Sequence, residues 1–288
     1  MTGSSGAVGP VVVRRRLGAA LRRLREDANM RLEQVAAELE VSPAKISRLE
    51  TGHSVAKTWD VRNLLTVYGV VDVERRTQIL GWVEESKAFG WWHPHSDVLP
   101  ANLDYYISLE AEAASVSLYA PFVPALLQTR AYAHAVIGDL FADVDRISAS
   151  DLDRLVDIRI ARQEALRRAE NPLAATVVLD EAALLRQVGG ADVMREQLVA
   201  LLAVDEAVDF RVRPLTAPVR RFALSSFSIF NPRLTTVDHT VVNVEAAGTD
   251  YYVEEAAEVL DFQNAFRTLW SESLGREDSL NLIRNLIR

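Results

Sequence analysis

The sequence predicts a mainly α-helical chain with a mixed α/β second domain that contains a small sheet. Apolar residues recur at helical spacing through residues 11–89, and strand-like runs appear only after residue 175. Between the two parts lies a run of Gly, Trp, His and Pro at residues 90–95, which is typical of a boundary. We therefore expect a disordered tail at 1–10, a helical domain at 11–89, a hinge at 90–102 and an α/β domain at 103–288.

The composition is that of a soluble globular protein. Of the 288 residues, 49% are hydrophobic and 25% are charged. No apolar run has the length of a membrane span, and the first residues lack the apolar segment of a signal peptide. With no cysteine, the chain has no disulfide framework, thiolate nucleophile or cysteine-bound metal. We expect a cytoplasmic protein.

Charge is distributed unevenly along the chain. Residues 1–68 contain eleven Lys and Arg against seven Asp and Glu, a net charge of +4, and the remainder carries −12. An acidic protein is a poor ligand for nucleic acid as a whole, but a basic first quarter can meet phosphate while the acidic remainder faces another partner.

Residues 30–52 predict two short helices joined by a tight turn, after a first helix at about 11–28. Ser42 is a good N-cap and Pro43 suits the first helical position of the second helix. Ile46 and Leu49 would face the preceding helix, which leaves a small polar and basic face outward. A helix presented in this way fits the major groove of B-DNA.

This stretch resembles the helix-turn-helix of the lambda-repressor-like, xenobiotic-response-element family, which implies a five-helix DNA-binding domain. The match rests on Ala36, Val41-Ser42, Ile46-Ser47-Arg48-Leu49-Glu50 and Gly52. Glu40 stands at the turn position usually held by Gly, so we expect some backbone strain there. The alternative is an ordinary core hairpin in a protein-interaction scaffold that does not bind DNA.

We expect the second helix, 43–50, to enter the major groove. Lys45 and Arg48 would contact bases or phosphates, and Ala44 and Ser47 would lie against base edges. Phosphates would be bound by backbone amides and loop side chains at Leu32, Ser42, Ser54 and Lys57. Glu50 would be structural, pairing with the first helix or capping neighbouring residues. One helix reads only a few base pairs, so we expect a homodimer on a near-palindromic double-stranded site.

The first domain should end with helices at 58–68 and 73–89, the former packing Trp59, Leu64 and Leu65 inward. Adjacent Trp91 and Trp92 predict a wedge between the domains or in a dimer interface. His93 and His95 flank a proline, but two ligands without a third are weak evidence for a metal. We predict neither a metal nor a cofactor.

The second domain should begin with a helix at 105–117, a proline-punctuated apolar loop at 119–129 and a helix through Tyr132. Ser150 or Asp151 would cap a long helix ending near 169. Strands are expected at 176–180, 208–212, 223–230 and 240–244. Helices are expected at 181–188, 192–203, 254–274 and 279–287.

Over almost its whole length the chain resembles the WhiJ-like regulators of actinobacteria. The matching motifs, in order, are Leu109-Glu110-Ala111-Glu112-Ala113, Val123-Pro124-Ala125-Leu126-Leu127-Gln128-Thr129, Tyr132-Ala133, Arg162-Gln163, Leu179-Asp180-Glu181-Ala182, Val188-Gly189-Gly190, Gln197-Leu198 and Val212-Arg213-Pro214-Leu215. Ala125 stands where Gly is usual, and the motif at 242–245 lacks its usual aromatic residue. The resemblance implies a transcription regulator, often encoded beside a small BldB-like protein in an antitoxin-like pair.

No enzyme signature is present. The chain lacks a Gly-x-Ser-x-Gly elbow, a zinc-binding His-Glu-x-x-His, a phosphate loop and a dinucleotide fingerprint. Arg162-Gln163 and Asp180-Glu181 would be pocket anchors or, preferably, a structural ion pair. Glu110 and Glu112 lie two apart and do not predict a catalytic pair, and His134 and His239 are expected to be structural.

Two hypotheses remain for the second domain. It would sense a small partner protein, whose docking changes DNA affinity, or it would bind an unidentified small molecule. The resemblance favours the partner protein. In either case the candidate contact residues are Tyr119, Phe122, Gln128, Arg162, Gln163, Tyr251 and Tyr252.

Overall fold

The computed structural model describes residues 10–52, 54–87, 90–100, 103–142, 147–204, 207–233, 240–246 and 249–287. The predicted tail at 1–10 lies outside them except for its last residue, which begins the first helix. The chain divides into two compact units, one formed by residues 1–94 with 107–109 and the other by 95–106 with 110–288. None of the described helices is both long and apolar enough to cross a membrane.

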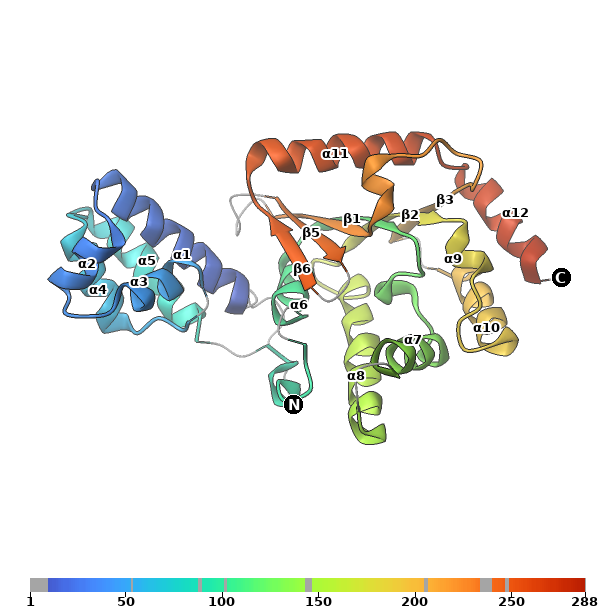
Figure 1. The fold of residues 1–288 in the computed structure, drawn as a ribbon, viewed down its shortest axis with the longest axis horizontal. Helices are drawn as coiled ribbons and strands as arrows, with labels where there is room; N and C mark the ends of the chain where they lie inside the picture. Colours follow the sequence, from blue (N-terminus) through green and yellow to red (C-terminus); the bar gives the residue numbers. More distant parts are fainter. Residues whose placement is uncertain are drawn as a thin grey trace. The chain divides into compact units, whose positions relative to one another are not determined.

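Five helices form the first unit, as predicted: α1 Pro10–Asp27, α2 Leu32–Glu38, α3 Pro43–Glu50, α4 Thr58–Val67 and α5 Val73–Glu85 (Figure 1). Their apolar faces meet in one core that includes Leu17, Leu21, Val35, Ala36, Ile46, Leu49, Val61, Leu64, Leu65, Ile79 and Val83. The core is continuous from α1 to α5, so helix packing rather than helix propensity holds these short elements.

Two details of this unit test the sequence expectations. Glu40 has φ 53°, in the left-handed region, so the turn between α2 and α3 carries the predicted strain. Trp59 was expected in the core and is 68% exposed, so that expectation was wrong. The buried positions of α4 are instead Asp60, Val61, Leu64 and Leu65, and this stripe turns Trp59 to solvent.

The segment after α5 contains the two adjacent tryptophans. Trp92 is 3% exposed and Trp91 is 48% exposed, and their rings meet edge to face with centroids 5.7 Å apart. Next comes a single 3₁₀ turn, η1 His93–His95. The wedge role proposed for the tryptophans stays a prediction.

The second unit combines helices with one mixed sheet, which confirms the predicted fold class (Figure 1). Its helical elements are α6 Leu103–Glu112, η2 Ala125–Leu127, α7 Arg130–Ala142, α8 Ala149–Arg162, η3 Gln163–Leu166, α9 Ala182–Leu185, α10 Ala191–Leu202, η4 Arg221–Leu224, α11 Ala256–Ser271 and α12 Arg276–Ile287. The N-cap of α8 is Ser148, whose hydroxyl accepts from the Asp151 amide. The sequence had predicted Ser150 or Asp151 as the cap, and that prediction was wrong.

The sheet has six strands in the order β3-β2-β1-β4-β5-β6. Neighbours β3, β2 and β1 run parallel, and β1, β4, β5 and β6 pair antiparallel. The strands are β1 Ser115–Ala120, β2 Ala174–Asp180, β3 Val208–Arg213, β4 Phe227–Asn231, β5 Val241–Ala246 and β6 Thr249–Val253. The parallel half needs crossover helices, and the segments between β1, β2 and β3 supply them.

Three sequence expectations for the sheet were wrong. β1 was assigned to the end of a helix at 105–117 and the following loop, but it is a central strand buried between β2 and β4. Its alternating Ser-Val-Ser-Leu is a strand signal that the helical pattern just before it obscured. β6 was not predicted, and the expected strand at 223–230 begins only at Phe227, because η4 occupies its first residues.

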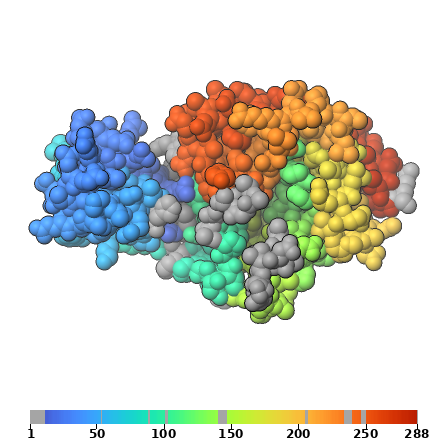
Figure 2. Space-filling model, viewed as in Figure 1, coloured from blue at the N-terminus to red at the C-terminus, as the bar shows by residue number. Residues whose placement is uncertain are grey.

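The two faces of the sheet are covered by different helices. In Figure 1, α11 runs along one face, and α6, α7, α8 and α10 lie on the other side. The α11 face contains Tyr119, Val178, Phe227, Ile229 and Val242, packed on Val259, Phe266 and Leu269 of the helix. Figure 2 shows the last part of the chain, coloured orange to red, forming the surface on that side.

Candidate nucleic-acid interface

The start of α3 is fixed by its own sequence. Ser42 has extended backbone angles, its hydroxyl accepts from the Lys45 amide at 3.3 Å, and Pro43 takes the first helical position. Ile46 and Leu49 are buried in the core shared with α2. This end of the helix and its inward face are therefore as the sequence predicted.

The other end of α3 is bound to α1 by a buried ion pair. Arg25 donates through Nε and Nη2 to the two carboxylate oxygens of Glu50, at 2.7 and 2.9 Å, and through Nη1 to the Met30 carbonyl at 2.9 Å. The hydrogen bonds to Glu50 raise the pKa of Arg25. Glu50 is thus structural and pairs with the first helix, as predicted.

Two glycines let α1 approach this end of α3 closely. A Cβ on Gly18 would lie 2.5 Å from the Glu50 carbonyl oxygen, and one on Gly52 would lie 2.9 Å from backbone atoms of Arg15. Gly52 also has φ +70°. Sequence reasoning missed Gly18, although a glycine inside a helix is itself a signal of close backbone approach.

The face that remains outward on α3 is small and basic. Ser42, Ala44 and Arg48 are exposed and Ser47 is half-buried. Among the described residues, no hydrogen bond or ion pair engages the Arg48 guanidinium, so it is available to an external acceptor. Arginine can bind both O6 and N7 of a guanine, which makes this position suited to direct base contact.

Lys45 differs from what the sequence suggested. Its ammonium lies 2.8 Å from Oδ1 of Asp60 on α4, so it turns toward the protein rather than straight out with Arg48. The pair borders a groove lined by Leu39, Val41, Lys45, Ile46, Leu49, Trp59, Asp60, Asn63 and Leu64. Because the partner lies fifteen residues away, no local pattern could have identified it.

The expected phosphate-binding residues lie at the ends of neighbouring helices. Leu32 begins α2, and its side chain packs against the core. Lys57 is exposed and is the N-cap residue of α4, and Ser54 is half-buried in the preceding loop. Amides at the first turn of a helix lack intrahelical partners, so these positions can bind phosphate.

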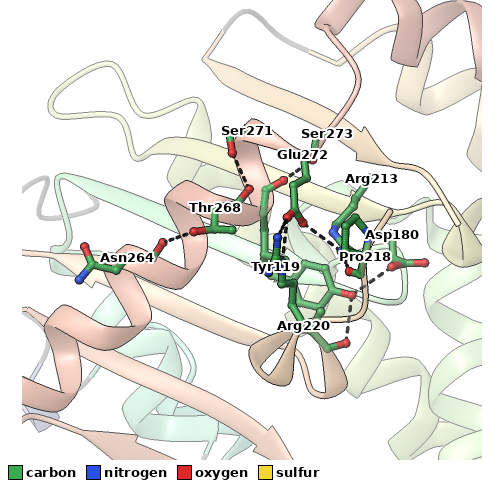
Figure 3. Close-up of polar contacts among 12 residues, drawn as sticks. Tyr119, Asp180, Arg213, Pro218, Arg220, Asn264, Thr268, Ser271, Glu272 and Ser273 are labelled. Carbon is green, nitrogen blue, oxygen red and sulfur yellow. Dashed lines mark hydrogen bonds and ion pairs between the residues drawn. The ribbon is translucent and has the colours of Figure 1, made fainter. Parts of the chain in front are cut away.

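In the second unit, Tyr119 does not line an open site. Its hydroxyl donates to Asp180 Oδ2 at 3.0 Å and to the Ala223 carbonyl at 3.1 Å (Figure 3). Burial, and then the Asp180 carboxylate, raise the pKa of Tyr119. Nearby, Glu272 accepts from Arg213 at 3.1 Å and from Arg220 at 2.8 Å. Together these contacts anchor the segment between β3 and β4.

Arg162 forms a structural ion pair, but with a different partner from the one considered. It donates through Nε and Nη2 to both oxygens of Glu110, each at 2.8 Å, and both side chains are buried. Asp180 instead binds Tyr119 and the Ala182 amide. The expected pairing of residues 162–163 with 180–181 was therefore wrong.

The two glutamines hold the loop around η2. Gln128 donates to the Val123 carbonyl at 2.7 Å and accepts from Arg159 at 3.0 Å, and Gln163 donates to the Ala125 and Gln128 carbonyls. Burial, together with the nearby Arg162, lowers the pKa of Arg159 to about 10. The hydrogen-bonding groups of these side chains are therefore engaged within the unit.

The remaining aromatic candidates are Phe122, in the loop after β1, and the neighbours Tyr251 and Tyr252 on β6. Phe122 is 47% exposed with Arg186 over its ring, Tyr251 is 59% exposed, and Tyr252 meets Tyr105 edge to face at 4.5 Å. The seven candidate contact residues of this unit therefore do not converge on one site.

Sequence reasoning also missed a polar cluster inside the second unit. The hydroxyls of Tyr106 and Ser228 lie 2.9 Å apart, and Ser228 pairs in register with Asn243 on β5. Asn243 is fully buried, and no residue in the described part of the chain hydrogen-bonds to either polar atom of its side chain. An amide in this state destabilises the fold, so a group that completes it would be bound favourably.

Metal-binding geometry does not occur in the part of the chain that the structure describes: no three His, Asp or Glu side chains gather there. His134 is exposed on α7. His239, the other lone histidine considered, lies outside the described residues.

The fold and the outward face of α3 define the first unit as a helix-turn-helix domain of the kind found in DNA-binding regulators. Comparison with known families agrees, because residues 16–78 match a family described as a helix-turn-helix domain. Residues 103–285 match the family described as a domain of unknown function, DUF5753, and the chain belongs to that family. Searches of curated proteins and of solved structures found no significant match.

Proposed function

We propose that the protein is a sequence-specific, DNA-binding transcription regulator that inserts α3 into the major groove. The observation that carries the proposal is the outward face of this helix, with Arg48 exposed and both ends of α3 fixed, by the Ser42 cap and by the Arg25–Glu50 pair. A rigid helix with a free guanidinium supports direct base contact. The xenobiotic-response-element type, homodimeric binding and a cytoplasmic location on the nucleoid belong to the same proposal.

Arg48→Ala tests this mechanism. In binding measured by fluorescence anisotropy, we expect a loss of about 1–3 kcal/mol on a duplex selected from a random pool. A scrambled duplex should lose much less. Arg23→Ala is the matched control, because it removes an exposed arginine from α1 of the same unit. An equal loss on both duplexes would assign Arg48 to phosphate.

We propose further that the second unit is a non-catalytic effector domain that senses a small partner protein and thereby changes DNA affinity. Two observations support this over a ligand pocket: the candidate contact residues do not converge, and several apolar side chains between β3 and β4 are exposed, namely Leu215, Val219 and Leu224. The resemblance to WhiJ-like regulators suggests a BldB-like partner encoded nearby, in an antitoxin-like pair.

The experiment is DNA binding by the full chain across a salt series, with and without the product of an adjacent small gene. A change in affinity on adding the partner supports docking, and unchanged affinity contradicts it. Leu215→Ser with Val219→Ser should abolish the effect of the partner and leave DNA binding alone intact. Val71→Ser with Val73→Ser, which changes exposed valines of the first unit, is the control.

A small-molecule effector is the second candidate. It is favoured by Asn243, whose buried carboxamide has no hydrogen-bond partner among the described residues, and by the adjacent Tyr106–Ser228 pair. A bound polar molecule would supply the missing hydrogen bonds and raise the unfolding temperature by mass action. A thermal-shift screen of small polar metabolites tests it: a hit must lose its effect in Asn243→Leu.

A further inference from the structure

The salt bridge between Lys45 and Asp60 places a carboxylate beside the helix that meets DNA. Lys45 Nζ lies 2.8 Å from Asp60 Oδ1, and the side chains are 37% and 11% exposed. A negative charge close to DNA weakens binding to the phosphate backbone. Asp60 is buried beside apolar side chains of the groove, so packing alone gives no reason for a carboxylate at this position of α4.

The side chains of Lys45 and Asp60 differ in how easily they can move. Asp60 lies in the first turn of α4 and lines the groove with Ile46 and Leu64, so its carboxylate is held in place. Lys45 carries its charge on a flexible four-carbon stem and is more exposed. The lysine can therefore leave the pair while the aspartate stays behind.

We propose that Asp60 is a specificity-determining residue that competes with DNA phosphate for the Lys45 ammonium. The proposal rests on the DNA-binding function proposed above. Non-cognate DNA is bound through its phosphates rather than its base edges. Transfer of Lys45 to a phosphate leaves a largely buried carboxylate without its partner, which is unfavourable.

On a cognate site, the free-energy cost of separating Lys45 from Asp60 is offset. Base-edge acceptors in the major groove, such as guanine O6 and N7, lie at fixed positions beside those that Arg48 contacts. The Lys45 ammonium then gains a base-edge acceptor at a fixed position, at the same time as the docked helix gains its other contacts. Asp60 thus lowers affinity for DNA in general more than affinity for the correct sequence, which is how a repulsive element gives specificity.

Asp60→Asn keeps the size of the side chain and removes its charge. We expect affinity for a scrambled duplex to rise roughly fivefold, with a salt slope steeper by about 0.9, because one more cation displaces counterions. Affinity for the selected duplex should rise less, so the ratio of the two affinities falls.

The experiment uses the full chain and duplexes selected by the wild type from a random pool. Anisotropy titrations across a KCl series compare wild type, Asp60→Asn, Lys45→Gln, the double variant and Glu74→Gln. Glu74 is an exposed carboxylate in the first turn of α5, so its variant makes the same charge change away from Lys45. Asp60→Asn raises affinity by freeing Lys45, so the double variant must show no such gain over Lys45→Gln alone.

Lys45→Gln alone gives an independent measurement should Asp60→Asn fold poorly: it should weaken binding to the selected duplex more than binding to the scrambled one. The inference is overturned if Asp60→Asn behaves like Glu74→Gln, weakens both duplexes, or keeps its gain without Lys45. Equal losses from Lys45→Gln on both duplexes would overturn it as well. If the wild type selects no sequence from the pool, the DNA-binding function itself fails.

Discussion

Arg25–Glu50 in the first unit and Arg162–Glu110 in the second are both bidentate ion pairs with distances of 2.7–2.9 Å. The pair in the second unit is the more enclosed, with side chains 5% and 2% exposed against 11% and 4%. Its arginine also lies over the Tyr106 ring, 4.9 Å from the centroid. The same kind of ion pair therefore stabilises the interior of the second unit, whereas in the first unit it holds the end of a helix that faces solvent.

From this difference we can predict which property of the protein depends on each ion pair. Removal of Glu110 should act on the stability of the second unit, whereas removal of Glu50 should act on the position of α3 and so on DNA binding. The predictions below separate the two roles.

The largest effect is expected from Glu110→Ala. It leaves the Arg162 guanidinium buried without a carboxylate, which costs about 3–5 kcal/mol of stability. Chemical denaturation of the full chain should show an earlier transition for the second unit. Replacing both partners, by Glu110→Leu with Arg162→Met, should recover most of the loss. If the double variant is no more stable than the single one, an unpaired charge is not the cause.

Glu50→Ala should cost less, about 2–4 kcal/mol, because Arg25 is more exposed and keeps the Met30 carbonyl. Here affinity for a selected duplex should fall together with stability, since the end of α3 is released. Retained affinity in a folded variant would show that the ion pair does not position the helix.

Gly18→Ala tests the close contact between α1 and α3 without touching a charge. The added methyl group would lie 2.5 Å from the Glu50 carbonyl oxygen, so the helices must separate, at a cost of about 1–3 kcal/mol. Gly81→Ala is the control, because a Cβ there has open space. Thermal unfolding should distinguish the two, and a stable Gly18→Ala would contradict the packing described.

The smallest effect is expected at Asp250 on β6. Burial, and then the neighbouring Glu245, raise its pKa, so the folded state binds this proton more tightly than the unfolded chain does. The carboxylate therefore disfavours the folded state at neutral pH, and this penalty disappears as the pH falls below about 4, the pKa of an unperturbed aspartate. Asp250→Asn should raise the unfolding temperature at pH 7 and have little effect at pH 3.5.

Sequence was informative where contacts are local. The Ser42 cap, the strained Glu40 turn and the buried Ile46 and Leu49 lie within a dozen residues, and each follows from spacing and backbone chemistry. The partner of Lys45 lies outside that range, as do those of Arg25 and Arg162, 25 and 52 residues away. Such pairings depend on tertiary structure, which no local pattern encodes.

The same limit explains one error in the first unit and others in the second. Trp59 was assigned to the core because it is large and apolar, although helix α4 buries Asp60 in that stripe instead. β1 was assigned to a helix because it follows one directly, and its identity as a strand comes from β2 and β4 on either side. The candidate contact residues were chosen by residue type, and residue type does not determine whether a side chain is already hydrogen-bonded.

The position of β1 has a consequence for how the protein is made. Ser115 pairs with Ala174 on one side and with Asn231 on the other, so the sheet cannot close until most of the chain has left the ribosome. Long-range pairing of this kind folds slowly, and helical units with local contacts fold fast. We expect the helix-turn-helix unit to fold first during synthesis, so that a nascent chain can engage DNA before its second unit is complete.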